Sequence, residues 1–469
     1  MKVLLVYPPT AQAITSILPK GVEAQRGAFP PLGILYLAGE LEKYNSLKIF
    51  AIDAPNQKLN YDEIAQFVER EEIEIVGITV LSFHLVDAVE LAQKIKIHSP
   101  KTKIIAGGPH PHIYPKETLS LGVFDAVVLG EGEKSFAELI KNINEKKPIN
   151  IKGVLAQGEQ ITNEKFPDFI KNLDELAFPA RRLLPKEIYY SVLSAQKPIT
   201  TAISSRGCPY KCIFCDRPHL GKKFRARSAE NVVSEMEECA RMGIKEIVFY
   251  DDNFTTQRER VLQIAELVKK EKIKISWDIR ARVGDLKKED YKLLKEAGLV
   301  RIHFGVESGD ERLLELIRKQ ITIDQARSAF KWAKEAGIET LAYFMLGLPS
   351  ETTETINRTI ELAKELEADF VHFSLLMLFP ATPIYKMALE KGIIERDLWQ
   401  EFAQHPTTDF SPPIWEENLD KTQLISALSK AYKKFYFRPR YIFSRLRKVS
   451  RFSALTHQAK MAVEILKLK

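Results

Sequence analysis

The chain has 469 residues, of which 45% are hydrophobic, and a formal net charge of +7 at pH 7. This length allows two or three domains with a sizeable core. Its four cysteines, three of them in one short segment, exclude a disulfide framework and favour a reducing compartment, so we expect a cytoplasmic protein. No apolar run is long enough to span a membrane, and Met1-Lys2 leads directly into a strand-like run, so no signal peptide is expected.

Short apolar, β-rich runs alternate with helical patterns over the first third of the chain. This alternation predicts an α/β domain over residues 1–145, with a doubly wound parallel sheet of the Rossmann-like kind. The expected strands are Val3–Tyr7, Lys48–Ile52, Ile75–Thr79, Lys103–Ala106 and Ala126–Leu129. The expected helices are Ile34–Tyr44, Tyr61–Glu71, Leu85–His98 and Ser135–Asn144.

Ligands of such sheets bind beyond the carboxyl ends of the strands. The loops at those ends are Tyr7–Thr10, Asp53–Asn56, Thr79–His84, Gly107–His110 and Gly130–Gly132. Their glycines would let the backbone approach a large flat or phosphorylated ligand, although turns need glycine as well. A nucleotide-binding Rossmann domain is disfavoured because no G-x-G-x-x-G follows the first strand.

These loops resemble the cobalamin-binding domain that precedes the catalytic domain in one large subfamily of radical S-adenosylmethionine (SAM) enzymes. The likeness lies in Pro30–Ala38, Ala106–His110 and Gly130–Glu133. It implies that cobalamin is contacted by Thr79, Gly107, Gly108, Gly130, Glu131 and Gly132. Many cobalamin domains ligate cobalt through the histidine of D-x-H-x-x-G, but Asp53–Gln57 contains no histidine. The resemblance therefore implies base-off cobalamin without a histidine ligand; the alternative is a domain that has kept the fold and lost cobalamin.

Residues 146–195 have weak periodicity and are interpreted as a connector. Gly153–Ala156 is strand-like, and the proline-bearing run Phe178–Pro185 has the composition of a linker. Together with Asn172–Leu176, this segment resembles the interdomain segment of the same subfamily.

Three of the four cysteines follow the β-forming run Pro198–Ile203, as Cys208-x3-Cys212-x2-Cys215. Three thiolates on one loop can hold a metal centre and leave a coordination position open to substrate. The alternative is a structural zinc loop with a distant fourth ligand, but such sites usually pair two C-x2-C halves. Cys239, the spare thiol, lies in a helical pattern.

This spacing resembles the radical SAM superfamily. The resemblance implies that Cys208, Cys212 and Cys215 hold a catalytic 4Fe–4S cluster, whose unique iron chelates the amino and carboxylate groups of SAM. Phe214 occupies the aromatic position before the last cysteine, which implies contact with the SAM adenine.

From residue 196 to 410 the pattern of strand, loop and helix repeats about six times, which predicts a partial (β/α)6 barrel. The expected strands are Thr200–Ser204, Glu246–Tyr250, Ile275–Ile279, Val300–Val306, Thr340–Leu346 and Phe370–Leu376. The expected helices are Ala229–Arg241, Arg258–Lys270, Lys288–Ala297, Ile323–Ala336 and Thr355–Leu366.

Polar residues cluster at the carboxyl ends of these strands, where barrel enzymes place their catalytic groups. Taken singly, each could be a solvated loop residue or a helix cap. Together they resemble the SAM-binding elements of the superfamily. The implied contacts are the methionine amino group with Asp251 or Asp252, the carboxylate with Arg280, the ribose with Glu307 and Ser308, and the adenine with Gly347. Leu378–Tyr385 resembles the motif after the last strand, with Ala381 where glycine is usual.

Residues 411–469 form a basic region that we expect to be helical. Lys433–Arg451 interleaves basic residues with aromatic ones and contains no acid. It could dock on a membrane surface or pack on the barrel, and RNA contact is disfavoured because no RNA-binding module accompanies it. Docking needs Phe435, Phe437 and Phe443 exposed, whereas packing, which we favour slightly, buries them.

These features together predict a cobalamin-dependent radical SAM enzyme. The resemblance implies that a 5′-deoxyadenosyl radical abstracts hydrogen from an unactivated carbon, which then receives a methyl group from methylcobalamin. An oxidative cyclisation or ring rearrangement, as in the anaerobic magnesium-porphyrin cyclase branch, stays open, as does a non-catalytic corrinoid or iron–sulfur sensor or carrier. The expected partners are a small-molecule substrate, lipid-like or tetrapyrrole, and an electron donor such as flavodoxin or ferredoxin. No nucleic acid is expected, and peripheral membrane contact stays open.

Overall fold

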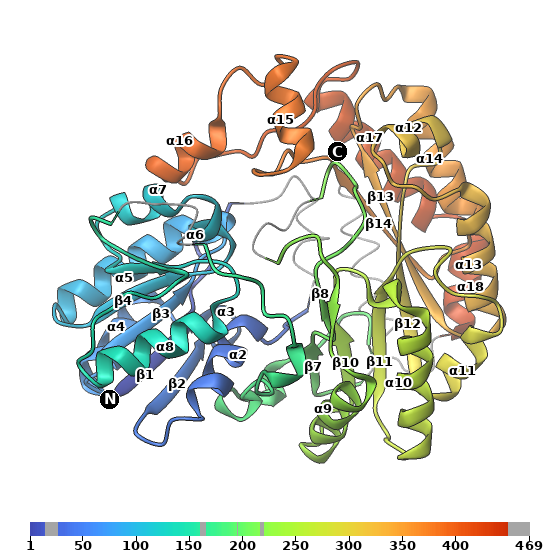
Figure 1. The fold of residues 1–469 in the computed structure, drawn as a ribbon. Helices are drawn as coiled ribbons and strands as arrows, with labels where there is room; N and C mark the ends of the chain where they lie inside the picture. The colour runs from blue at the N-terminus through green and yellow to red at the C-terminus, as the bar shows by residue number, and fades with distance from the viewer. Residues whose placement is uncertain (15–26, 160–165, 195, 216–219, 449–469) are drawn as a thin grey trace.

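The computed structural model describes residues 1–14, 27–159, 166–194, 196–215 and 220–448, excluding the side chains of residues 444–448. Two six-stranded sheets with flanking helices lie side by side in this structure (Figure 1). The basic residues Arg445, Arg447, Lys448 and Arg451 of the tail therefore lie outside the described side chains.

The first sheet has the strand order β2-β1-β3-β4-β5-β6, and its first five strands are parallel. They are β1 Lys2–Tyr7, β2 Lys48–Asp53, β3 Ile75–Thr79, β4 Lys103–Gly107 and β5 Ala126–Val128, which confirms the five expected strands. Its helices are α2 Leu32–Leu41, α3 Ala54–Gln57, α4 Tyr61–Arg70, α5 Leu85–His98, α6 Pro109–Ile113, α7 Pro115–Ser120 and α8 Gly132–Asn144.

Alternation along β1 shows why this sheet is covered on both faces. Val3 and Leu5 pack in one core with α2 and α8, whereas Leu4 and Val6 pack in another with α4 and α5. Successive strand residues point to opposite faces of a sheet, so a continuous apolar strand must be covered by helices on both sides. The doubly wound architecture is therefore confirmed.

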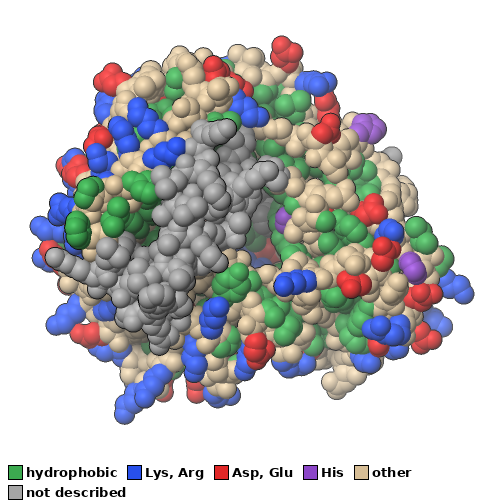
Figure 2. Space-filling model, turned by 180° about the vertical axis from the view of Figure 1, so that it is seen from behind, with side chains coloured by type: hydrophobic (Ala, Val, Ile, Leu, Met, Phe, Trp, Pro, Cys, Tyr) green, Lys and Arg blue, Asp and Glu red, His purple; other side chains and the backbone are tan. Residues whose placement is uncertain are grey.

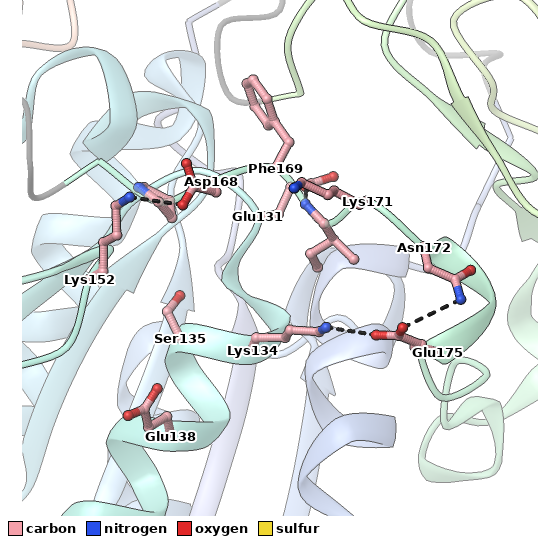
Figure 3. A pocket seen from close by; sticks show the side chains of 12 residues that line it. Glu131, Lys134, Ser135, Glu138, Lys152, Asp168, Phe169, Lys171, Asn172 and Glu175 are labelled. Atoms are coloured by element: carbon pink, nitrogen blue, oxygen red, sulfur yellow. Dashed lines mark hydrogen bonds and ion pairs between the residues drawn. The ribbon is translucent and has the colours of Figure 1, made fainter.

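The segment interpreted as a connector is packed against the first domain. Its strand β6, Val154–Ala156, pairs antiparallel with β5 at the edge of the sheet. The segment also contains the short 3-10 helices η3 Leu173–Glu175, η4 Arg181–Leu183 and η5 Lys186–Ile188. Lys134 on α8 forms an ion pair with Glu175 at 2.9 Å, and Lys152 forms one with Asp168 at 2.9 Å (Figure 3). The segment thus lies along α8 instead of forming a loose tether.

The second sheet is wholly parallel, with the order β14-β13-β12-β11-β10-β7. Its strands are β7 Ile199–Ala202, β10 Glu246–Phe249, β11 Ser276–Ala281, β12 Leu299–Glu307, β13 Glu339–Leu346 and β14 Phe370–Leu375. The outer helices are α9 Ala229–Arg241, α10 Arg258–Lys270, α11 Asp290–Glu296, α12 Glu311–Leu316, α13 Ile323–Glu335 and α14 Thr353–Glu365. Because β7 and β14 are edge strands that do not pair, the barrel is open, as predicted.

Two small elements that contact or precede the cysteine segment were not expected from the sequence. Helix α12 is too short for a periodic signal, and a two-stranded antiparallel ribbon joins β8, Ser205–Arg206, to β9, Arg225–Ala226. The ribbon is important for the site because β8 leads directly into the cysteine segment.

Alternate residues on the barrel strands face an accessible interior. Tyr343 and Met345 on β13, and His372 and Ser374 on β14, are half-buried, whereas Phe344, Leu346, Phe373 and Leu375 between them are buried. This two-residue period places the first set inside the barrel and the second set under the helices. The interior side chains of these strands are therefore partly accessible and partly polar.

The C-terminal helices are α15 Pro383–Glu390, α16 Leu398–Gln404, α17 Lys421–Tyr436 and α18 Pro439–Lys448. Helix α16 crosses to the first domain and packs on α7 (Figure 1). On α17, the Tyr432 hydroxyl donates to the Phe373 carbonyl at 2.8 Å and the Tyr436 hydroxyl donates to the Val371 carbonyl at 2.8 Å. These tyrosines cover the free edge of β14, a position at which an unprotected strand invites aggregation.

The two alternatives for the tail apply to different helices. Phe435 on α17 is fully buried and Phe437 is half-buried, so α17 packs on the barrel. Phe443 on α18 is 66% exposed, and membrane contact through α18 stays a prediction. None of the described helices is long and apolar enough to cross a membrane. On the face seen in Figure 2, basic and acidic side chains are interspersed over the described surface.

Candidate functional site

A cavity of about 650 Å³ lies at the carboxyl ends of the first sheet, and both domains line it. All five loops expected to bind a ligand contribute to its wall, through Tyr7, Asp53, Asn56, Thr79, Leu81, Gly107, Gly108, Gly130, Glu131 and Gly132. The barrel domain adds Thr201, Ile203, Arg206 and Tyr250. A ligand in this cavity would therefore touch the first sheet and the start of the barrel together.

The glycines of the cavity play two different roles. A Cβ atom on Gly33 would have no neighbour within 4 Å, and one on Gly107 would meet its nearest neighbour at 3.9 Å, so both leave open space. Gly108 has φ +106°, and a Cβ there would lie 3.0 Å from the Val80 carbonyl oxygen, so its conformation requires glycine. The open space and the apolar α2 wall fit a large flat group such as cobalamin.

The loop after β2 supplies no histidine, and no described residue in the lining of the cavity is a histidine. Asp53 is buried instead and accepts hydrogen bonds from Tyr189 Oη at 2.9 Å and Asn56 Nδ2 at 2.8 Å. Burial raises the pKa of the Asp53 carboxyl above its usual range. The lining is therefore compatible with the expected cobalamin that lacks a histidine ligand.

Glu131, directly before α8, and Glu133, in the first turn of α8, bind two arginines of the barrel domain. Glu131 accepts from Arg206 at 3.0 Å and from Arg225 at 2.7 Å, and Glu133 accepts from Arg206 at 2.5 Å. These four residues, here named the Arg206 junction, have side chains that are at most 8% exposed. Burial would raise the pKa of Glu133, but Arg206 overrides this effect and holds the pKa below its usual range.

The junction changes what can be expected of Glu131. Both of its carboxylate oxygens are occupied, since Oε2 also accepts the backbone N–H of Ile170 in the connector at 2.7 Å. The expected contact of Glu131 with cobalamin thus stays a prediction for its backbone rather than for its carboxylate. Arg206 was not expected; its signal in the sequence is an arginine directly before Gly207-Cys208, facing a loop with two glutamates.

The cysteine segment starts directly after Arg206 and is anchored at three points. Gly207 has φ +79°, and a Cβ there would lie 2.4 Å from the Lys223 carbonyl oxygen. The Ile213 backbone N–H donates to the Ile317 carbonyl at 3.1 Å, and the Ile213 carbonyl accepts from the Ile384 N–H at 3.0 Å. The segment is thereby held between the end of α12 and the start of α15.

Cys208 and Cys212 are half-buried and Cys215 is exposed, and none of them is in a disulfide. Burial raises the pKa of the Cys208 thiol to about 11, so a metal must displace its proton. Each cysteine of a four-iron cluster ligates a different iron; within the described ranges no three ligands converge as they would around one zinc ion. Cys239 is fully buried in α9, as a core residue.

The two aspartates expected near the SAM amino group are in different environments. Asp251 is 1% exposed and accepts from the Ser204 backbone N–H at 2.8 Å, the Ser204 hydroxyl at 2.6 Å and the Ser205 hydroxyl. Burial raises the pKa of Asp251. Asp251 therefore holds Ser204 and Ser205, which lead into Arg206 and the cysteine segment. Asp252, half-buried and within electrostatic range of Cys208, is the better candidate for the amino group.

Lys319, which follows α12, is a cation of the site that was not expected. Its Nζ lies 2.7 Å from Glu307 Oε1 and 5.9 Å from the centroid of the Phe214 ring. Glu307 has φ +72°, a left-handed conformation that costs energy for a residue with a side chain. Ser308 is fully buried, and its hydroxyl accepts the Asp310 backbone N–H at 3.2 Å. No motif marks Lys319, because only the fold brings it to Phe214.

Gly347 has φ +83°, which requires glycine, and its N–H donates to Glu351. Glu351 also accepts the Leu348 N–H at 3.0 Å, and burial raises the pKa of this carboxyl to about 7. Ala381 has φ +61°, which explains why glycine is usual at this place in the motif that Leu378–Tyr385 resembles. Both loops follow barrel strands, and the second leads into Ile384, which donates to Ile213 of the cysteine segment.

Arg280 lies inside the barrel on β11. Its guanidinium stands 3.9 Å from the centroid of the Tyr250 ring, and Tyr250 in turn lines the cavity. The structure thus brings Arg280 close to the cavity shared by both domains; its expected contact with the SAM carboxylate stays a prediction.

Comparisons with known proteins match both domains. Residues 22–140 match the B12 binding domain, and residues 202–363 match the radical SAM superfamily. An uncharacterized methyltransferase of Pyrococcus horikoshii is 34% identical over 94% of this chain and 94% of its own. The anaerobic magnesium-protoporphyrin IX monomethyl ester cyclase of Rubrivivax gelatinosus is 24% identical over 89% of this chain and 75% of its own.

The fold is also similar to that of a solved structure. The cobalamin-dependent S-adenosylmethionine radical enzyme OxsB superposes with a TM-score of 0.75 and 18% identity, over 99% of this chain and 72% of that one. The two family matches, together with 34% identity over almost the whole of a relative, show that the chain belongs to the B12-binding radical SAM enzyme family, whose cofactors are an iron–sulfur cluster, SAM and cobalamin.

Proposed function

We propose that this radical SAM enzyme transfers a methyl group to an unactivated carbon of a small-molecule substrate. The observation that carries the proposal is the single cavity at the carboxyl ends of the first sheet, which the barrel domain helps to line. The Arg206 junction ties the loop expected to hold cobalamin to the cysteine segment. The name of the Pyrococcus relative, a methyltransferase, supports the same reaction.

When bound, the cluster supplies the electron that cleaves SAM and cobalamin supplies a carrier for the methyl group. The chain provides Cys208, Cys212 and Cys215 as cluster ligands. Asp252 and Lys319 offer an anion and a cation close to the cysteine segment, which match the ammonium and carboxylate of the SAM methionine. In this proposal Glu307 faces the ribose and is oriented by its ion pair with Lys319.

A second reaction, oxidative cyclisation, is favoured by the relationship to the magnesium-protoporphyrin cyclase. Both reactions use the same cluster, SAM and cavity and differ in what happens to the substrate radical. A substrate of lipid-like or tetrapyrrole type, and an electron donor such as flavodoxin or ferredoxin, belong to this proposal. The strand-end residues around the cysteine segment favour turnover over a non-catalytic sensor or carrier.

Product analysis distinguishes these functions. Anaerobically reconstituted, cobalamin-loaded and reduced protein would be incubated with SAM carrying a deuterated methyl group and a small-molecule extract from cells that lack the protein. A methyltransferase yields 5′-deoxyadenosine, S-adenosylhomocysteine and a deuterium-labelled product. A cyclase yields 5′-deoxyadenosine without a labelled product, and a sensor or carrier yields neither nucleoside.

A further inference from the structure

Arg280 is a cation inside the barrel that Asp278 influences electrostatically but that forms no ion pair with a carboxylate of the described residues. Its guanidinium stacks over the Tyr250 ring at 3.9 Å and lies within electrostatic range of the Tyr343 hydroxyl, which pairs with His303 Nδ1 at 3.0 Å. No aspartate or glutamate oxygen of a described residue lies within 4.0 Å of it. Asp278, two residues earlier on the same face of β11, is shared by Arg301 at 3.2 Å and His303 at 3.5 Å.

Other buried arginines among the described residues bind a carboxylate or a backbone carbonyl, although Arg181 Nη1, Arg260 Nη1 and Arg301 Nε have no hydrogen-bond partner. Arg181 and Arg227 share Glu235, and Arg301 binds Asp278 and Glu339. Arg260 and Arg282 have no carboxylate either, but they donate to backbone carbonyl oxygens. Arg280 has neither kind of partner among the described residues, although a desolvated guanidinium is strongly stabilised by an anion that accepts its N–H groups.

An anion can reach Arg280 because the surrounding interior is accessible. Arg280 is half-buried, and so are Tyr250, Tyr343, His372 and Ser374, whose side chains face the interior from neighbouring strands. Tyr250 separates Arg280 from the cavity by a single ring. A substrate that lies between this cavity and the barrel would therefore present one end to Arg280.

We propose that Arg280, with the hydroxyls of Tyr250 and Tyr343, binds an oxyanion of the substrate, either a carboxylate or a phosphoryl group. This inference rests on the proposed function, because it assumes that the substrate occupies the space next to the cavity. It assigns the substrate to the acidic small molecules and excludes neutral hydrocarbons. The SAM carboxylate has the same chemistry, but Lys319 lies beside Phe214 of the cysteine segment and offers it a separate cation.

Ligand-observed NMR on the cofactor-loaded enzyme tests the site with three probes: acetate, methylphosphonate and acetamide, the uncharged counterpart of acetate. We expect acetate or methylphosphonate to bind and acetamide not to bind. Arg280→Gln should weaken binding of the anion by about tenfold or more, since it removes a charge-assisted pair of hydrogen bonds. Arg280→Lys, which keeps the charge, should fall between, and Arg327→Gln on the surface should match the wild type.

Titration with SAM separates the two sources of the oxyanion. If the site serves the substrate, SAM and the probe bind together, and Arg280→Gln leaves the affinity for SAM within about twofold of the wild type. Displacement of the probe by SAM, with weaker SAM binding by Arg280→Gln, would overturn the proposal. So would equal binding of acetate by wild type and Arg280→Gln, or equal binding of acetamide. Formation of 5′-deoxyadenosine by the wild type is measured separately, so failure of the proposed function can be distinguished from failure of the anion site.

Discussion

Two neighbouring regions of the molecule differ in whether their arginines are paired with carboxylates. They are the Arg206 junction and the barrel interior around Arg280. In the junction, Arg206 and Arg225 are matched by Glu131 and Glu133, and all four side chains are almost fully buried. In the barrel, Arg280 stacks on Tyr250, forms no ion pair with a carboxylate of the described residues and stays partly accessible. A buried network of ion pairs between two segments fixes them relative to one another, whereas a reachable charge without an ion-pair partner is available to a ligand.

The Arg206 junction joins the first domain, the connector and the segment that leads to the cysteines. Glu131 also binds the connector through the Ile170 N–H, so three parts of the chain meet at one carboxylate. The cysteine segment begins at the residue after Arg206. The junction therefore sets the position of the cysteine segment relative to the cavity, whereas Arg280, which faces the accessible interior, is proposed to bind the substrate.

The largest effect is expected from breaking the cysteine segment that the junction positions. Cys212→Ala should abolish both the brown colour of the reconstituted protein and its cleavage of SAM, because a cluster with two protein ligands is not retained. Iron content and 5′-deoxyadenosine measure the two losses. Cys239→Ala, in the core of α9, should retain both; a full cluster in Cys212→Ala would contradict the assignment.

Removing one partner from the junction should destabilise the protein strongly. Glu133→Ala leaves Arg206 with one carboxylate in a buried setting, where breaking a pair costs about 3–5 kcal/mol. Denaturant unfolding of the protein measures this change in the free energy of unfolding. Lys134→Ala, next in the sequence, breaks the exposed pair with Glu175 and should leave the free energy of unfolding almost unchanged. Equal effects of the two substitutions would show that the junction is not a structural network.

Filling the cavity should block cobalamin without unfolding the domain. Gly33→Phe places a ring where a Cβ atom meets nothing within 4 Å, so the affinity for hydroxocobalamin should fall while the melting temperature stays close to that of the wild type. Gly108, which the sequence pattern singled out, is a poorer choice because its φ of +106° strains any side chain. Equal retention of cobalamin by wild type and Gly33→Phe would place the ligand elsewhere.

The smallest effect concerns the pH dependence of the Gly347 loop. The folded-state pKa of Glu351, raised to about 7 by burial, exceeds that of an unfolded glutamate. The folded protein therefore binds more protons between about pH 4.5 and 7, and this group's stabilisation is present at the lower pH and lost as the pH rises. Glu351→Gln should flatten this part of the stability profile by about 1–3 kcal/mol, as judged by unfolding at several pH values. An unchanged slope would mean that Glu351 is ionised in the folded state.

Sequence periodicity was sufficient for the fold and for the loops of the cavity. Continuous apolar strands and amphipathic helices predict both sheets, and the carboxyl ends of parallel strands bring Gly107, Gly130 and Tyr7 together without further information. What could not be predicted depends on contacts between distant segments. The β8–β9 ribbon is too short for a pattern, and Arg206 and Lys319 gain their roles only from the carboxylates that folding places beside them.

The predicted site residues also divide into those that a local motif identifies and those whose availability depends on contacts in the fold. The cysteine spacing is local, so Cys208, Cys212 and Cys215 follow directly from the sequence. Asp251, Glu131 and Ser308 lie where the motifs suggested, but their side chains are occupied by Ser204, Arg206 and Asp310 in the described structure. A motif gives the position of a polar group, whereas its hydrogen-bond partners decide whether that group is free to bind a ligand.

Electron paramagnetic resonance of protein that holds both the reduced cluster and cob(II)alamin tests the central claim most directly. The claim is that both groups are bound at one site, with the Arg206 junction between their loops. We predict a magnetic interaction that broadens or splits both signals, compared with samples that hold either group alone. A spectrum that is the plain sum of the two separate signals, at full occupancy of both groups, would contradict a shared site.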